Sequence, residues 1–177
     1  AADIAEQIDF VGGYINAFTS KECTCFYTKT VSDKLRLSAD ILSDIYKNSL
    51  FSDSAIELER KVILEEINMY EDSPEDLVLD TLTENSWQGS LGFNILGSSE
   101  NVKSLTSSEM RSYMAKYYTA KNTVISCAGN FDEDELMETL EEFFSDIPKG
   151  EKCAEFEPSV FKTGSITKYK NIEQSHI

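Results

Sequence analysis

Hydrophobic residues recur at three- and four-residue intervals over much of the chain, the spacing that one face of an α-helix requires. Capping signals, glycine and proline bound these stretches. The predicted helices cover residues 1–11, 33–47, 54–72, 74–87, 106–118 and 131–147. Two of them begin at capping-box pairs, Ser54 with Glu57 and Thr106 with Glu109. Ser73 followed by Pro74 starts another.

Other segments are rich in aromatic and β-branched residues and predict strands. Residues 14–20 and 22–31 predict two strands joined by a short turn, and residues 123–130 predict a buried strand. Residues 165–170 predict a final strand, whereas residues 88–105 predict a loop with three glycines. The pattern indicates an α+β fold, in which helices pack on a mixed or antiparallel sheet. We expect a single domain over residues 1–177.

The charge of the chain excludes some partners. Its 177 residues include 32 Asp and Glu against 16 Lys and Arg, a formal net charge of -16. Such a surface repels nucleic-acid phosphates and anionic membrane surfaces, so we expect neither as a partner. No apolar run reaches the roughly 20 residues that a membrane-spanning helix needs.

The four cysteines form no C-x-x-C pair, and the chain has one histidine. A Cys/His zinc cluster is therefore a poor interpretation. Cys23 and Cys25 alternate within a predicted strand, and we expect free, mostly buried thiols in a reducing compartment. Because no signal peptide is visible either, the prediction is a cytoplasmic location.

Two glutamates are candidates for chemistry. Glu59 and Glu66 are seven residues apart and project from one face of a predicted helix, with Ile63 between them. Their Cα atoms lie roughly 10 Å apart, so one small cation would not readily take both. One could be a metal ligand and the other a supporting group. Spacing alone favours the plainer alternative, a pair of solvated or salt-bridged glutamates.

The strand after Gly12-Gly13 is a second candidate. If residues 14–19 form an exposed edge, an extended peptide could add to them through main-chain hydrogen bonds. An ordinary strand without a ligand is the plainer interpretation. No phosphate loop and no Ser/His/Asp arrangement is available. We expect His176 to be a strand residue without a catalytic role.

Three segments together resemble the insulinase and mitochondrial-processing type of zinc peptidase. Residues 2–31 contain the helix, the Gly-rich turn and the N-A-x-T-S-x-E strand of that family. The run ELERKVILEEI is similar to its E-R-x-V-I-x-x-E helix, and residues 91–136 resemble its L-G-x-x-I-L-G loop, helix and G-x-x-D segment. The order and spacing agree along nearly the whole chain.

The resemblance implies roles for individual residues. Glu66 matches the third zinc ligand of the family, and Glu59 matches an acid that supports the active site without binding the metal. Asn16, Ala17 and Phe18 match the edge strand that receives the peptide substrate, with Phe18 near the scissile bond. The implied cofactor is zinc, and the implied reaction is hydrolysis of peptide bonds in peptides or unfolded segments.

One departure from the family is large. Its signature is H-x-x-E-H, in which two histidines bind zinc and the glutamate acts as general base. The 177 residues contain no such motif. We expect it shortly before Ala1, and a second homologous half or partner subunit after Ile177. This chain by itself is predicted to be inactive and to bind no stoichiometric zinc. The alternatives are a non-catalytic scaffold or substrate-presenting member of the family, and an unrelated acidic interaction domain.

Overall fold

The computed structural model describes residues 2–151 and 158–169. The chain forms two compact units. Of the described residues, the first unit contains residues 2–19, 24–50 and 111–151, and the second contains residues 20–23, 51–110 and 158–169.

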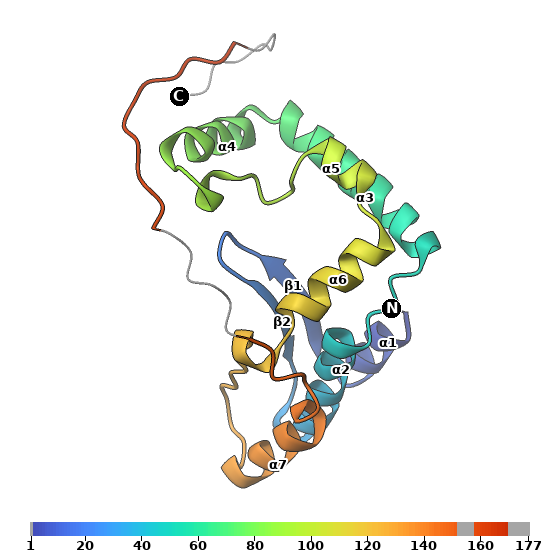
Figure 1. The fold of residues 1–177 in the computed structure, drawn as a ribbon. Helices are drawn as coiled ribbons and strands as arrows, with labels where there is room; N and C mark the ends of the chain where they lie inside the picture. The colour runs from blue at the N-terminus through green and yellow to red at the C-terminus, as the bar shows by residue number, and fades with distance from the viewer. Residues whose placement is uncertain (1, 152–157, 170–177) are drawn as a thin grey trace. The chain divides into compact units, whose positions relative to one another are not determined.

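An antiparallel hairpin and its helices build the first unit (Figure 1). Tyr14 pairs with Lys29 at one end of the hairpin, and Thr19 pairs with Thr24 at the other. Gly12, which has a positive φ of 66°, lets the chain turn from the first helix into the first strand. The elements are α1 (Ala2–Phe10), β1 (Tyr14–Thr19), β2 (Thr24–Lys29), α2 (Leu35–Lys47) and α7 (Glu133–Phe144), with 3₁₀ turns at Ser32–Lys34 and Ala120–Asn122.

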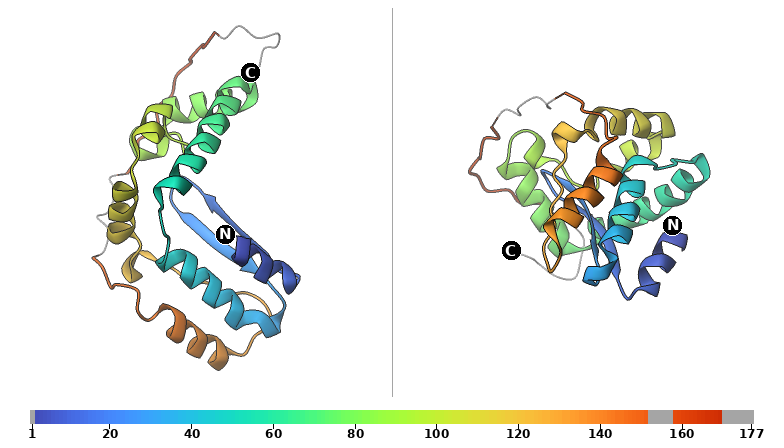
Figure 2. Two further views of the ribbon diagram at one scale, coloured as in Figure 1. Left: turned by 90° about the vertical axis from the view of Figure 1, so that its right-hand side faces the viewer. Right: turned by 90° about the horizontal axis from the view of Figure 1, so that it is seen from below.

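The core of the first unit forms around α2, which contacts β2 and α7, as Figure 2 shows from a second direction. Ile41 of α2 is buried, and so is Ile8 of α1. Phe26 of β2 approaches the ring of Tyr118 at 6.5 Å between centroids, and Tyr46 of α2 approaches the same ring at 5.0 Å. Burial raises the pKa of Tyr118, because the charged phenolate would lose hydration there.

Two cationic side chains join α2 to α7 and the turn after it. Lys47 donates to the carboxylate of Asp146 at 2.8 Å and to the carbonyl of Phe143 at 2.7 Å. The hydrogen bond from Lys47 lowers the pKa of Asp146. Arg36 pairs with Glu142. These exposed pairs contribute less to stability than the apolar core does.

Helices dominate the second unit. They are α3 (Asp53–Asp72), α4 (Pro74–Ser86), a 3₁₀ turn at Ser90–Gly92, α5 (Ser99–Ser104) and the start of α6 (Ser107–Tyr117). A later segment runs beside the end of α4: Trp87 and Phe161 form an antiparallel bridge, and Lys162 N–H donates to the Ser86 carbonyl at 2.7 Å. The Trp87 and Phe161 rings meet edge to face, with 5.2 Å between their centroids.

The α+β class, the hairpin and most helices agree with the sequence predictions. Ser73 caps α4 through the Asp76 N–H, and Thr106 forms the predicted capping box with Glu109. The prediction for α3 was wrong at its start, because Ser52 rather than Ser54 accepts the capping hydrogen bond. The predicted loop over residues 88–105 contains the short helix α5. The single-domain assignment stays a prediction.

Both later strands were predicted wrongly. Residues 123–130 form no strand, and Val124 is 93% exposed. Residues 165–169 form no strand either; the β-bridge in this part of the chain lies at Phe161, which pairs with Trp87. The cysteine prediction was also partly wrong: described cysteines are free, but Cys23 lies in the turn before β2, and both it and Cys127 are exposed. His176 and Cys153 lie outside the described residues.

We predict that the capping box of α6 makes part of the stability depend on pH. Hydrogen bonds from Thr106 lower the pKa of Glu109 below its usual 4.5. A lowered folded-state pKa stabilises the fold above the unfolded-state pKa, and that contribution is lost as the pH falls through the folded-state value. Thr106→Ala should therefore lower the melting temperature at pH 7, and the difference from wild type should narrow in acid.

Thermal melts between pH 3 and pH 7 would measure this difference. Ser73→Ala is the matched control, because it removes a cap that accepts from a main-chain N–H alone. A constant difference between wild type and Thr106→Ala across the whole range would contradict the prediction.

Candidate functional site

Helix α3 carries both candidate carboxylates. Its inner face consists of Ile56, Arg60, Ile63, Leu64 and Ile67, which recur at helical spacing and are more buried than their neighbours. Glu59 and Glu66 lie about two helical turns apart, on the same flank of this face. The predicted shared face is therefore confirmed, within a continuous helix that ends at Asp72.

The flank of α3 that bears the two glutamates is exposed to solvent. Neither the Glu59 nor the Glu66 side chain makes a hydrogen bond or ion pair within residues 2–151 and 158–169, so the salt-bridged alternative is not seen there. Leu58, Val62 and Met69 lie beside them on the helix surface and are also exposed. This flank thus combines free carboxylates with an apolar stripe.

Arg60 joins α3 to α5 from the inner face. Its guanidinium donates to the carbonyl of Val102 and, at 2.9 Å, to the carbonyl of Leu105. It also pairs with Glu57 one turn earlier, at 3.1 Å. The Arg60 side chain is 15% exposed and its contact with Val102 is partly buried, whereas the Glu57 side chain is 63% exposed.

Strand β1 carries the three predicted substrate residues. It pairs with β2 alone among the described residues, so it is an edge strand, as predicted. Asn16 and Phe18 lie on one face of the hairpin, and Ala17 lies on the other. Tyr14, Phe18 and Tyr27 make that first face aromatic and exposed, with Tyr27 6.3 Å from Phe18 between ring centroids. Hydrogen bonding with Tyr14 raises the pKa of Tyr27.

The predicted approach of Glu66 to the strand that bears Asn16 stays a prediction. Glu66 belongs to the second unit and Asn16 to the first.

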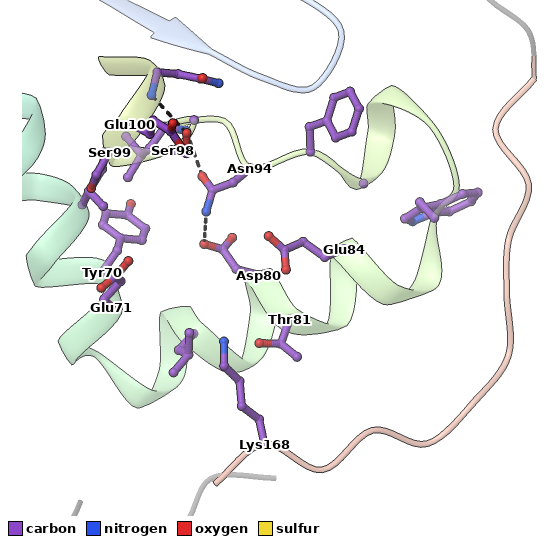
Figure 3. Close-up of a pocket in the computed structure, with 18 of the residues that line it drawn as sticks. Tyr70, Glu71, Asp80, Thr81, Glu84, Asn94, Ser98, Ser99, Glu100 and Lys168 are labelled. Carbon is purple, nitrogen blue, oxygen red and sulfur yellow. Dashed lines mark hydrogen bonds between the residues drawn. The ribbon is translucent and has the colours of Figure 1, made fainter. Parts of the chain in front are cut away.

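A pocket of about 980 Å³ lies within the second unit, between α3, α4 and the segment that leads into α5 (Figure 3). Tyr70 and Glu71 line it from α3, and Asp80 and Glu84 line it from α4. Asn94 spans the pocket wall: its amide donates to Asp80 at 2.6 Å and its carbonyl oxygen accepts from Leu96 N–H at 2.9 Å.

Acidic and apolar side chains together line this pocket. Carboxylates of Glu71, Asp80, Glu84 and Glu100 line it, together with one lysine, Lys168. Such a lining favours cationic groups over anionic ones. Sequence reasoning missed the pocket, because its walls come from four separate segments. The one local signal was Gly92, whose backbone lies so close to Trp87 that a Cβ would sit 2.5 Å from the Trp87 carbonyl oxygen.

The donor chemistry fits a zinc site in part. A free glutamate carboxylate on a helix is a suitable zinc ligand, and Glu66 is such a group. A catalytic zinc takes three protein ligands, and no group of three metal-binding side chains occurs within the described part of the chain. Glu66 therefore fits as one ligand of a site that needs further ligands.

Two family models match the chain. Residues 1–99 match the insulinase family, peptidase family M16, and residues 104–177 match the peptidase M16 inactive domain.

Curated relatives support the same grouping. The chain is 39% identical to an uncharacterized zinc protease, YmxG, of Bacillus subtilis, over 100% of this chain and 43% of the relative. It is 37% identical to a probable mitochondrial-processing peptidase subunit beta of Arabidopsis thaliana, over 81% of this chain and 27% of that protein. The chain thus spans less than half the length of these relatives.

The fold resembles solved structures as well. A protease from Helicobacter pylori superposes with a TM-score of 0.78 at 19% identity, over 87% of this chain and 38% of that one.

No helix within residues 2–151 and 158–169 has the length and apolar character that a membrane crossing requires.

We predict that Gly92→Ala destabilises the wall of the pocket. The new methyl group would overlap the Trp87 carbonyl, and relieving such overlap costs about 1–3 kcal/mol of unfolding free energy. Urea unfolding measures the change. Gly164→Ala is the matched control, because a Cβ there meets nothing within 4 Å, and it should stay within about 0.5 kcal/mol of wild type. Equal effects of the two substitutions would show that the close approach is wrong.

Proposed function

This chain belongs to the insulinase family, peptidase family M16, and we propose that it forms part of a zinc-dependent peptidase that hydrolyses peptide bonds in peptides or unfolded segments. The observation that carries the proposal is the free carboxylate of Glu66, at the end of an E-R-x-V-I-x-x-E sequence on one continuous helix.

Glu66 would be one zinc ligand. Its carboxylate is exposed, has no partner in the described structure, and stands on a helix that inner-face contacts hold in place. When bound, zinc would polarise the scissile carbonyl and lower the pKa of the attacking water. Glu59, two turns earlier on the same flank, would support the site through its negative charge without binding the metal, because one small ion cannot readily reach both carboxylates.

The other ligands and the general base would come from an H-x-x-E-H segment outside residues 1–177. The apolar stripe of Leu58, Val62 and Met69 supports this proposal, because a covering segment would gain roughly 25 cal/mol for each Å² of apolar surface that it buries. The same segment would bring its ligands close to Glu66.

The edge of β1 would receive the substrate. Its outer edge pairs with no other strand within the described residues, so an extended peptide could add to it, and the exposed ring of Phe18 can contact a substrate side chain. The Ala17 N–H donates to the Asn16 side-chain oxygen at 2.8 Å, so a bound peptide would have to displace the Asn16 amide before it pairs with Ala17. Asn16 and Ala17 would then contribute through their main chain. A second homologous half or partner subunit would enclose the bound peptide.

A non-catalytic scaffold of the same family is the alternative. The enzyme is favoured because Glu59 and Glu66 are both present and because relatives of similar sequence are named zinc proteases.

We predict that Glu66→Gln in the full-length protein lowers zinc affinity roughly 100-fold or more, because the neutral amide replaces an anionic ligand. Peptidase activity should fall with the metal content. Metal analysis after dialysis against a mild chelator, together with cleavage of a fluorogenic peptide, measures both effects.

Glu65→Gln is the matched control, since Glu65 is an equally exposed neighbour that points about 100° away around the helix. It should change neither zinc content nor activity. If Glu66→Gln kept full zinc content and activity, Glu66 would not be a ligand.

We also predict that Phe18→Ala raises KM roughly fivefold, because about 1 kcal/mol of apolar contact with the substrate is lost. Stability should change little, since Phe18 is 52% exposed. Steady-state kinetics on a panel of peptides gives the change. Phe10→Ala removes a more exposed phenylalanine outside the strand and should leave KM unaltered. Identical KM values for all three proteins would remove Phe18 from the substrate site.

A further inference from the structure

Arg60 satisfies carbonyl groups that the end of a short helix would otherwise leave without partners. Helix α5 closes with the hydrogen bond from Leu105 N–H to the Asn101 carbonyl, at 3.0 Å. The next donor in helical order, Thr106 N–H, is turned to the Glu109 carboxylate at 2.8 Å. The Val102 carbonyl therefore loses the amide that would have continued the helix, and Arg60 donates to it instead.

The bond to Leu105 extends the same contact. One planar guanidinium thus bridges two carbonyls three residues apart at the negative end of α5. Both acceptors are main-chain atoms, so they stay fixed relative to α5. The Arg60 contact is consequently directional, unlike the apolar contacts of the aliphatic side chains around it.

The position of Arg60 within α3 makes this contact relevant to the glutamates. Arg60 follows Glu59 directly and precedes Glu66 by six residues, all within one helix. Ile67 anchors the inner face near Glu66, but an apolar contact tolerates sliding and rotation better than a forked hydrogen bond does. A slip of α3 by one residue would move Glu66 by about 1.5 Å along the axis and turn it by about 100°.

We propose that Arg60 is a positioning residue, which fixes the axial position and rotation of α3 and thereby the direction in which Glu66 presents its carboxylate. This inference rests on the proposed role of Glu66 as a zinc ligand. Arg60 itself would touch neither metal nor substrate, since it lies on the inner face with its guanidinium engaged by α5.

The test compares Arg60→Gln and Arg60→Lys with wild type in the full-length protein. Zinc dissociation constants come from competition with a chromogenic chelator, well below each melting temperature. Arg60→Gln should weaken zinc binding about 10- to 100-fold, the range found when groups that orient a metal ligand are removed. The zinc affinity of Arg60→Lys should lie between those of wild type and Arg60→Gln, because an ammonium keeps the charge but cannot form the forked pair of hydrogen bonds. The visible spectrum of the cobalt-substituted protein should change in Arg60→Gln, and kcat should fall while KM stays constant.

Arg111→Gln is the matched control. Arg111 also donates from its guanidinium to a main-chain carbonyl, that of Leu50 at 2.7 Å, but it is not on α3. Its removal should lower stability without changing the zinc dissociation constant or the cobalt spectrum. An equal loss of zinc affinity in Arg111→Gln and Arg60→Gln would overturn the inference, because the effect would then be one of general stability.

The inference and the proposed function can fail separately. If Glu66→Gln binds zinc normally, the ligand role itself is wrong. If Glu66→Gln loses zinc while Arg60→Gln binds it within twofold of wild type, the positioning role alone is wrong. If Arg60→Gln does not fold, Arg60→Lys serves as the test of the positioning role. A folded Arg60→Lys with wild-type zinc affinity and cobalt spectrum would overturn the inference.

Discussion

The second unit depends on the contact between the Arg60 guanidinium and the carbonyls at the end of α5. A buried isoleucine contact sets how close two helices lie, whereas a forked hydrogen bond to main-chain atoms also sets their register. The same contact links two further features of the chain: it satisfies the carbonyl that the capping box of α6 leaves free, and it attaches α5 to the helix that carries Glu59 and Glu66.

The two sides of α3 have opposite properties as a result. On the inner side, Ile67 is buried, and Arg60, which is 15% exposed, is paired with main-chain carbonyls at the end of α5. On the flank, carboxylates without partners stand beside exposed apolar side chains. A covering segment would remove the apolar stripe from water, and a bound cation would give the carboxylates a partner. The flank is therefore suited to completion by another segment and by a cation.

Much of the fold could be predicted where the deciding interaction is local. The caps at Ser73 and Thr106 use hydrogen bonds over three residues, and the sequence shows both partners. Helix α5 has only six residues in a glycine- and serine-rich stretch, which is too short for a periodic hydrophobic pattern to indicate a helix. Residues 123–130 have the composition of a strand, but a strand is defined by a partner that pairs with it, and composition does not supply that partner.

The candidate site divides along the same line. The shared flank of Glu59 and Glu66 follows from a spacing of seven on a helix, so the residues alone predicted it. The anchoring by Arg60 did not follow, because its acceptors, Val102 and Leu105, are main-chain carbonyls more than 40 residues away. The Val102 carbonyl is free to accept only because Thr106 directs its amide to Glu109. A side chain can be recognised by type, but an available carbonyl is a property of the backbone fold. For that reason a sequence pattern indicates which residue could bind a metal, and the structure is needed to indicate which residue holds it in place.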